Sequence, residues 1–271
     1  MKKGSSKQYL SLATAVCLAT IPVVADNLTR AAQNPISSLI SLPMQFTFDN
    51  GAENGDANIL NVQPVYPITS GDWNYVSRMI IPLVDAPGAV PGLPGIPSSE
   101  PGPRSTGLGD INYSLFLSPV EVGSFIWGGG VSMAMPTASK DTLGSGKFSI
   151  GPTAVILKQT DWGSVGVLGR QIWSVAGDSD RKDVSQALVE PFISYNLEGG
   201  WYLSSDMIWI ANWKADSGNQ WTIPLGGGFG RIFKIGDQSV NSKLEAYTNV
   251  VKPDGAPDWN LRFVFQFLFP K

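Results

Sequence analysis

Residues 259–271 read WNLRFVFQFLFPK, and this stretch predicts how the chain folds. Successive side chains of a β-strand point to opposite faces. A strand here has one bulky apolar face, made of Trp259, Leu261, Phe263, Phe265, Phe267 and Phe269. Its other face carries an arginine and two amides, in the set Asn260, Arg262, Val264, Gln266 and Leu268. Such a strand separates an apolar environment from a polar one, and the rest of the sequence indicates which face points to the inside of the fold.

The composition indicates many short strands joined by turns. Of the 271 residues 43% are hydrophobic and 15% are charged, whereas soluble domains have roughly 25% charged residues. The chain contains 30 glycines and 20 prolines, which favour turns. After residue 25 no stretch reaches the ~18 consecutive apolar residues of a membrane-spanning helix. The apolar content is therefore spread over short segments.

Residues 1–25 are predicted to be a signal peptide that is cleaved after export. Three lysines precede the apolar run YLSLATAVCLATIPVV, and a small-residue cleavage site ends at Ala25. Losing three lysines and no acid takes the net charge from −3 to −6, which argues against nucleic acid as a partner. The single cysteine, Cys17, lies in this segment, so the exported chain has no disulfides. A lipid anchor on Cys17 is disfavoured because Val16 is large for the preceding position.

Twelve runs with a period of two are bounded by turn residues. They span 42–49, 58–68, 73–84, 108–118, 124–137, 146–159, 163–176, 185–197, 201–213, 220–233, 239–250 and 258–269. The connections between them alternate between short turns such as TSGD and longer polar loops such as KADSGN. This alternation is typical of a transmembrane antiparallel β-barrel, with short periplasmic turns and longer extracellular loops. A soluble sandwich has no reason to sort its loops in this way.

The predicted organisation is a periplasmic lead-in or plug at 26–41 followed by an outer-membrane barrel at 42–271. An apolar set favours a short amphipathic turn or helix in and next to the lead-in, namely Leu28, Ile36, Leu39 and Ile40. The long connection from Asp85 to Gly107 contains PGLPGIP, which is stiff and non-helical. We expect this connection to act as a lid or to fold into the barrel.

The apolar rows are predicted to face lipid, because large side chains would only partly fill the interior of twelve strands. Tryptophans near the predicted strand ends are typical of the aromatic belts at membrane surfaces. They are Trp73, Trp127, Trp173, Trp201, Trp213, Trp221 and Trp259. The phenylalanine row of residues 259–269 is therefore expected to face lipid, and Arg262 and Gln266 to face the interior.

The residue types argue against an enzyme. The chain has no histidine, which excludes Ser-His hydrolases and most zinc sites. GSGK at 144–147 and GGGFG at 226–230 do not match nucleotide-binding loops. The acidic loop GDSDRKD at 177–183 is most simply a solvated loop. We expect no catalytic residues, no cofactor and no metal.

The candidate functional residues are polar side chains on the inward rows. They are Arg78, Asp110, Lys147, Arg170, Glu190, Asp206, Glu245, Arg262 and Gln266. Charges inside a membrane barrel must be paired or hydrated. They either brace a narrow barrel as ion pairs or line a pore that selects solutes, and the two roles can coexist.

The chain resembles a family of bacterial outer-membrane proteins labelled as transporters or as meta-pathway phenol degradation-like, and sometimes mislabelled neuromedin U. NPISSLISLP, GLGDINYSLFLSP, LGSGKFSIGPTAV and PDWNLRFVFQFLFPK are among the stretches that carry this resemblance. The resemblance implies passive transport of small solutes, with hydrophobic or aromatic compounds among them. The alternative is a closed barrel with a structural or surface-interaction role. Expected partners are outer-membrane lipid, a small-molecule solute and the barrel-assembly machinery, although Pro270 and Lys271 extend the chain beyond the usual terminal aromatic residue.

Overall fold

The computed structural model describes residues 22–270, so most of the predicted signal peptide lies outside the described residues. Within that range no helix is long and apolar enough to cross a membrane. One α-helix, α1 (Pro22–Ala32), precedes fifteen strand segments, and two short 3-10 helices, η1 (Asp141–Leu143) and η2 (Glu198–Gly200), lie in connections. The strand segments are β1 (Ile40–Asn50), β2 (Ala57–Val62), β3 (Val65–Ser70), β4 (Trp73–Ala86), β5 (Ser105–Leu108), β6 (Ile111–Pro119), β7 (Ile126–Met135), β8 (Lys147–Gln159), β9 (Gly163–Gly177), β10 (Ser185–Asn196), β11 (Trp201–Asp206), β12 (Trp209–Asn212), β13 (Trp221–Ile235), β14 (Gln238–Val251) and β15 (Trp259–Phe269).

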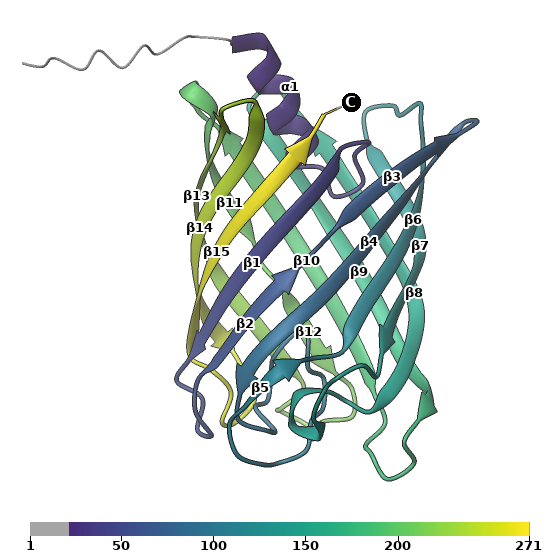
Figure 1. Ribbon diagram of the computed structural model, residues 1–271, viewed down its shortest axis with the longest axis vertical. Coiled ribbons are helices and arrows are strands. Elements are labelled where there is room, and N and C mark those ends of the chain that lie inside the picture. The colour runs from purple at the N-terminus through teal and green to yellow at the C-terminus, as the bar shows by residue number, and fades with distance from the viewer. Residues whose placement is uncertain (1–21, 271) are drawn as a thin grey trace, which may run out of the picture.

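The fifteen segments form twelve spanning strands in one closed antiparallel barrel (Figure 1). Three spanning strands are interrupted, as the pairs β2–β3, β5–β6 and β11–β12. Each spanning strand pairs with its neighbour in the sequence, and β1 closes the ring by pairing with β15 from Ile40↔Phe269 to Asn50↔Trp259. The predicted fold class and strand number are therefore confirmed.

Proline explains one of the interruptions. Pro64 separates β2 from β3, because it has no N–H to donate to the ladder. Hydrogen bonding continues around it: Gln63 N donates to the Pro43 carbonyl at 2.8 Å, and Met79 N donates to the Pro64 carbonyl at 3.1 Å. The barrel wall is thus kept together on both sides of the break.

The two faces of β15 differ as the alternation predicts. Trp259 is 45% exposed and Phe263 is 36% exposed on the outside, whereas Arg262 is 4% exposed inside the ring. Leu268 is also buried on the inner face, so the inner row combines charge, amide and apolar groups. The expected orientation of this strand is confirmed.

Exposed tryptophans gather at both rims of the barrel. Near the turn end Trp73 and Trp127 meet edge to face, with ring centroids 6.3 Å apart. Near the loop end Trp213 and Trp221 meet in the same way at 5.5 Å. These positions match the aromatic belts of membrane barrels, where the amphipathic rings sit at the lipid–water boundary.

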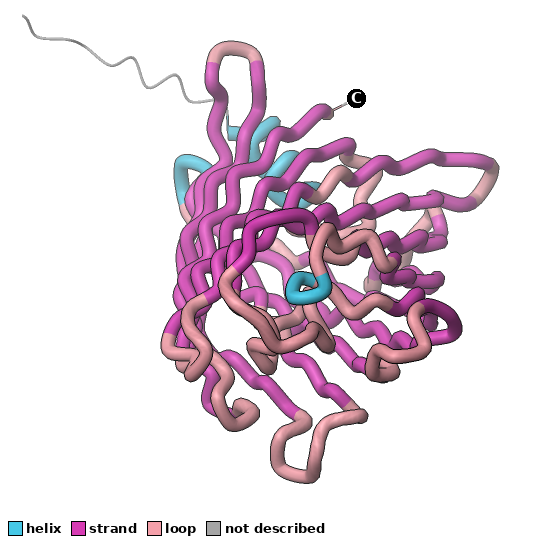
Figure 2. Tube along the Cα trace, turned by 60° about the horizontal axis from the view of Figure 1, so that its bottom comes forward, coloured by secondary structure: helices cyan, strands magenta, loops and turns pink. Residues whose placement is uncertain are grey.

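The ends of the barrel differ in the length of their connections. Helix α1, the C-terminal end of β15 and the short turns share one end, hereafter the turn end (Figure 1). The longer connections share the opposite end, hereafter the loop end. Figure 2 shows connections and η1 lying across the opening at the loop end. The predicted sorting of loops by length is confirmed.

Exchange of Phe263 for arginine should reveal which face meets lipid. An arginine on the lipid face near the membrane midplane costs about 2–4 kcal/mol of folding free energy. The same exchange at Gln266, which lines an internal cavity, should cost clearly less. Urea unfolding in lipid vesicles, followed by tryptophan fluorescence, measures both variants. Equal losses at the two positions would contradict the assigned faces.

Candidate functional site

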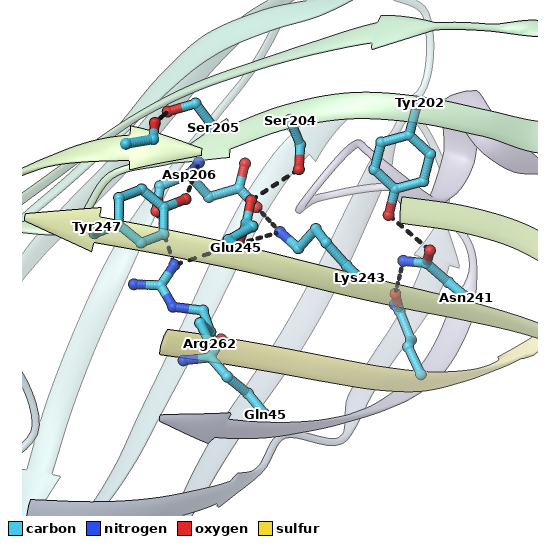
Figure 3. Close-up of polar contacts among 12 residues, drawn as sticks. Gln45, Tyr202, Ser204, Ser205, Asp206, Asn241, Lys243, Glu245, Tyr247 and Arg262 are labelled. Atoms are coloured by element: carbon cyan, nitrogen blue, oxygen red, sulfur yellow. Dashed lines mark hydrogen bonds and ion pairs between the residues drawn. The ribbon is translucent and has the colours of Figure 1, made fainter. Parts of the chain in front are cut away.

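A network of charges lies inside the barrel on the wall formed by β11 to β15 (Figure 3). Glu245 is its most buried member, at 1% exposure. Its Oε1 accepts a hydrogen bond from Ser204 at 2.8 Å, and its Oε2 lies 3.2 Å from Lys243 Nζ. Lys243 also forms an ion pair with Asp206. One lysine thus neutralises two acids, Asp206 on β11 and Glu245 on β14, whose strands are separated by β13.

Arg262 extends this network to β15, the last strand of the barrel. Its Nη1 donates to the Asp206 carbonyl at 2.8 Å and lies 3.8 Å from Glu245 Oε2. Its guanidinium also lies over the Tyr247 ring, 4.8 Å from the centroid. The Tyr247 hydroxyl in turn accepts a hydrogen bond from Asp206 N at 2.8 Å. These contacts tie β15 to β11, which are not neighbours in the sheet.

A second arginine ties another part of the wall together. Arg170 on β9 donates to Asn112 Oδ1 on β6 at 2.9 Å and to Gln186 Oε1 on β10 at 3.2 Å. Strands β6 and β9 are separated by β7 and β8, so this contact spans the interior. Such cross-interior contacts brace the barrel and narrow any passage through it.

Arg78 and Glu190 differ from the paired charges. Arg78 donates from Nη2 to Gln63 Oε1 at 2.8 Å and, within residues 22–270, has no carboxylate within 4.0 Å. Glu190 has neither a hydrogen bond nor an ion pair with any side chain of the described range. Both residues line the same internal cavity, together with Gln266.

Two of the predicted residues lie away from this group, at the loop end. Asp110 accepts hydrogen bonds from Ser145 N at 2.6 Å and from Ala138 N at 3.2 Å, so it anchors the β7–β8 connection. Lys147 pairs with Asp183 at 3.4 Å, and this contact holds the pKa of the Asp183 carboxyl below its usual value. The structure therefore gathers seven of the nine predicted residues in the middle of the barrel and uses these two to fix loops.

The sequence prediction missed two inward charges on the strands. Lys243 lies two positions from Glu245 on β14, so the alternation that selected Glu245 also points to it. Asp49 is buried on β1 and lines the smaller internal cavity with Arg262. Both were detectable by the same period of two.

Two cavities, of about 170 Å³ and about 70 Å³, lie among the described residues inside the barrel. Arg78, Glu190, Asp206 and Lys243 line the larger cavity, toward the turn end. Arg262 and Asp49 line the smaller one, toward the loop end. Because Arg262 bonds to Asp206, the charged network lies between the two cavities.

The lead-in segment, residues 26–41, covers the larger cavity. Ile36 is 2% exposed and packs against Val76 and Phe116 of the inner wall. Gln33 donates to Asn196 Oδ1 at 2.8 Å and accepts from Ser164 Oγ at 3.0 Å. The helix that precedes these contacts ends at Ala32, earlier than the amphipathic segment expected from the sequence.

The connection of residues 87–104, hereafter the inward loop, closes the other end. Val90, Leu93 and Ile96 are buried among apolar side chains of β2 and β4. Four residues of the inward loop, Gly92, Pro94, Gly95 and Ile96, line the smaller cavity together with Thr222. The loop therefore folds into the barrel, as its length and proline content suggest.

Arg181, on the connection after β9, holds the inward loop in place. Its Nε lies 3.0 Å from Glu100 of that loop, and its Nη1 lies 3.4 Å from Asp141 on η1. Its Nη2 donates to the carbonyls of Asp141 and Gly144. A second anchor is Arg104, whose pKa is raised by its hydrogen bonds to Asp85. Three loops thus meet at the buried Arg181 side chain.

Comparisons with known proteins support the fold. No protein-family model matches the chain, and no curated protein matches it. The structure is similar to the COG4313 outer membrane channel from Pseudomonas putida F1, with a TM-score of 0.58 and 15% identity over 85% of this chain and 94% of that one. The CymD monoaromatic hydrocarbon channel has a TM-score of 0.45 and 10% identity, over 89% of this chain and 91% of that one. Outer membrane phospholipase A from Escherichia coli has a TM-score of 0.42 and 13% identity, over 90% of this chain and 98% of that one. At 15% identity the similarity to the first of these structures concerns the fold alone, a closed β-barrel.

Replacing Lys243 with methionine should lower the free energy of unfolding of the barrel. The change leaves Asp206 and Glu245 without their shared cation, and breaking a buried ion pair on one side costs about 3–5 kcal/mol. A second change, Glu245→Gln, removes one of the two unpaired negative charges and should restore part of the lost free energy of unfolding. Urea unfolding of both single variants and the double variant measures the coupling. Strictly additive losses would contradict a shared network.

Proposed function

We propose that this chain forms an outer-membrane channel through which small solutes diffuse passively, hydrophobic or aromatic compounds among them. The observation that carries the proposal is the pair of internal cavities, one toward each end of a membrane-spanning barrel. The larger cavity has a mixed lining, with charged groups such as Arg78 beside apolar groups such as Phe192. A mixed lining accepts solutes that have both a polar and an apolar part.

The proposed orientation follows the general plan of bacterial barrels. Short turns lie in the periplasm and long loops lie outside the cell. Helix α1 and the lead-in segment are then periplasmic, and the inward loop faces the medium. Export through a cleaved signal peptide and assembly by the barrel-assembly machinery complete this proposal, and no catalytic activity is expected.

Passage of a solute requires two rearrangements. The inward loop has to move outward, which breaks the contacts of Arg181 with Glu100 and Asp141. The solute then has to pass the charged network, where Arg262 meets Asp206. The Glu100 and Asp141 side chains are 46% and 88% exposed, so water can hydrate both carboxylates when their contacts with the buried Arg181 side chain break.

The second candidate is a closed barrel with a structural or surface-interaction role. The observation in its favour is that Arg170 and Arg262 tie strands together across the interior. In that case the charges serve stability alone, and the inward loop stays in place.

Single-channel recording in a planar bilayer separates the two candidates. We expect discrete, salt-dependent conductance steps for the refolded protein, because a solute path through the barrel contains water. The Arg181→Ala variant should open more often, since the inward loop loses its main anchor. Lys182→Ala removes a neighbouring exposed cation and serves as the matched control.

A correctly inserted protein that remains silent, with Arg181→Ala equally silent, would contradict the channel and favour the closed barrel. Insertion is checked independently by the shift in gel mobility between folded and heat-unfolded protein. Increased opening in Lys182→Ala to the same extent as in Arg181→Ala would contradict the assigned role of Arg181 as the loop anchor.

A further inference from the structure

Among the residues that line the larger cavity, one cation and one acid have no ionic partner within residues 22–270. Arg78 lies on β4 and Glu190 on β10, with β6, β7, β8 and β9 between them along the sheet. The two residues therefore extend into the cavity from well-separated parts of the wall. Lys243 and Asp206 also line this cavity, but they are paired with each other.

The Arg78 side chain is held in place while most of its donors stay unused. Gln63 accepts one hydrogen bond from its Nη2 at 2.8 Å. Gln63 is itself buried, and its backbone N–H is bonded to Pro43. A guanidinium has five N–H donors in a planar fork that matches the two oxygens of a carboxylate. The remaining donors are thus available for an anionic group in the cavity.

Glu190 supplies the complementary chemistry. An ionised carboxylate accepts hydrogen bonds and has no donor of its own. In the described part of the chain its carboxylate accepts no hydrogen bond, and its interactions with Arg78 and Lys243 are purely electrostatic. A charge at membrane depth must be hydrated or paired. A solute with a hydroxyl or amino group would supply the missing donor.

The rest of the cavity wall limits the size and character of the solute. Leu168, Phe192 and Val264 give it apolar surface. Its volume of about 170 Å³ is of the size that accepts one six-membered ring, since a cavity of about 150 Å³ binds benzene. A solute that fits is therefore compact, with one ring or a body of similar size.

We propose that this cavity is a binding site for a compact organic acid that carries a hydrogen-bond donor at the end opposite its carboxylate. The carboxylate binds the Arg78 fork, the hydroxyl or amino group donates to Glu190, and the apolar body contacts Leu168 and Phe192. The proposal rests on the proposed function, because it assigns the solute class that the channel holds in transit.

Calorimetric titration of the detergent-refolded protein tests this site without requiring transport. The probes are 4-hydroxybenzoate, benzoate and phenol, which carry both groups, the carboxylate alone and the hydroxyl alone. The intact protein should bind 4-hydroxybenzoate more tightly than either of the other two. Arg78→Gln should weaken the binding of 4-hydroxybenzoate and benzoate about ten- to hundredfold, because charge-assisted hydrogen bonds are lost. The binding of phenol should stay nearly unchanged.

Glu190→Gln gives the opposite pattern for benzoate. It should weaken the binding of 4-hydroxybenzoate and phenol. It should strengthen the binding of benzoate, because a negative charge near the carboxylate is removed. Arg231→Gln is the matched control, since Arg231 lies over the Trp201 ring, away from the cavity, and should change nothing. If Arg78→Gln does not fold, Arg78→Lys keeps the charge without the fork and should still weaken the two acids.

Binding of 4-hydroxybenzoate that is unchanged in the Arg78 variants would overturn the site. Equal binding of 4-hydroxybenzoate, benzoate and inorganic phosphate would also overturn it and leave a general anion site. Channel recordings on the same preparation keep the two proposals apart. Binding without conductance contradicts the channel and leaves the site standing, whereas conductance without binding contradicts the site alone.

Discussion

Pairing of the backbone is the constraint on which the rest of this structure depends. A backbone N–H or C=O that has no hydrogen bond in lipid costs about several kcal/mol. A sheet that spans the membrane therefore has to close into a ring, so that no strand edge is left unpaired. Here closure is the pairing of β1 with β15 along eleven residue pairs. Once the ring is closed, each strand has one row of side chains in lipid and one inside. The phenylalanine row and the arginine of residues 259–269 are then placed on opposite sides by geometry alone.

The inner row then has to solve an electrostatic problem. Charges that are removed from water need partners, and a buried pair stabilises only when its geometry is good. Lys243 with its two acids, and Arg262 with Glu245 and the Asp206 backbone carbonyl, meet this need by contacts within the chain itself. Within residues 22–270 Arg78 and Glu190 have no ionic partner, and in the binding site proposed above a solute completes their coordination in the cavity beside them. Under that proposal, bracing and solute binding are two uses of one set of inward charges.

Much of the fold could be predicted because its signals are local. The period of two within each strand and the alternation of short and long connections are readable from neighbouring residues, and they gave the twelve strands and their faces. The partners of the inward charges could not be predicted, because they come from strands distant in sequence, as Arg170 and Asn112 do. The role of Arg181 was also hidden, since loops have no period and its partner Glu100 lies 81 positions earlier. Pro64 was a visible signal for an interrupted strand, whereas the break between β11 and β12 has no such marker.

The most direct test of this account is the water accessibility of single cysteines on adjacent positions of β15. A chain that begins at Asp26 has no cysteine of its own, so Gln266→Cys and Phe265→Cys each provide one thiol. In lipid vesicles a charged, water-soluble thiol reagent should modify the cysteine at position 266, which lines the larger cavity. It should leave the cysteine at position 265 unmodified, while a lipid-soluble maleimide reacts there. Modification of position 265 by the charged reagent, with position 266 protected, would contradict the placement of lipid outside and water inside.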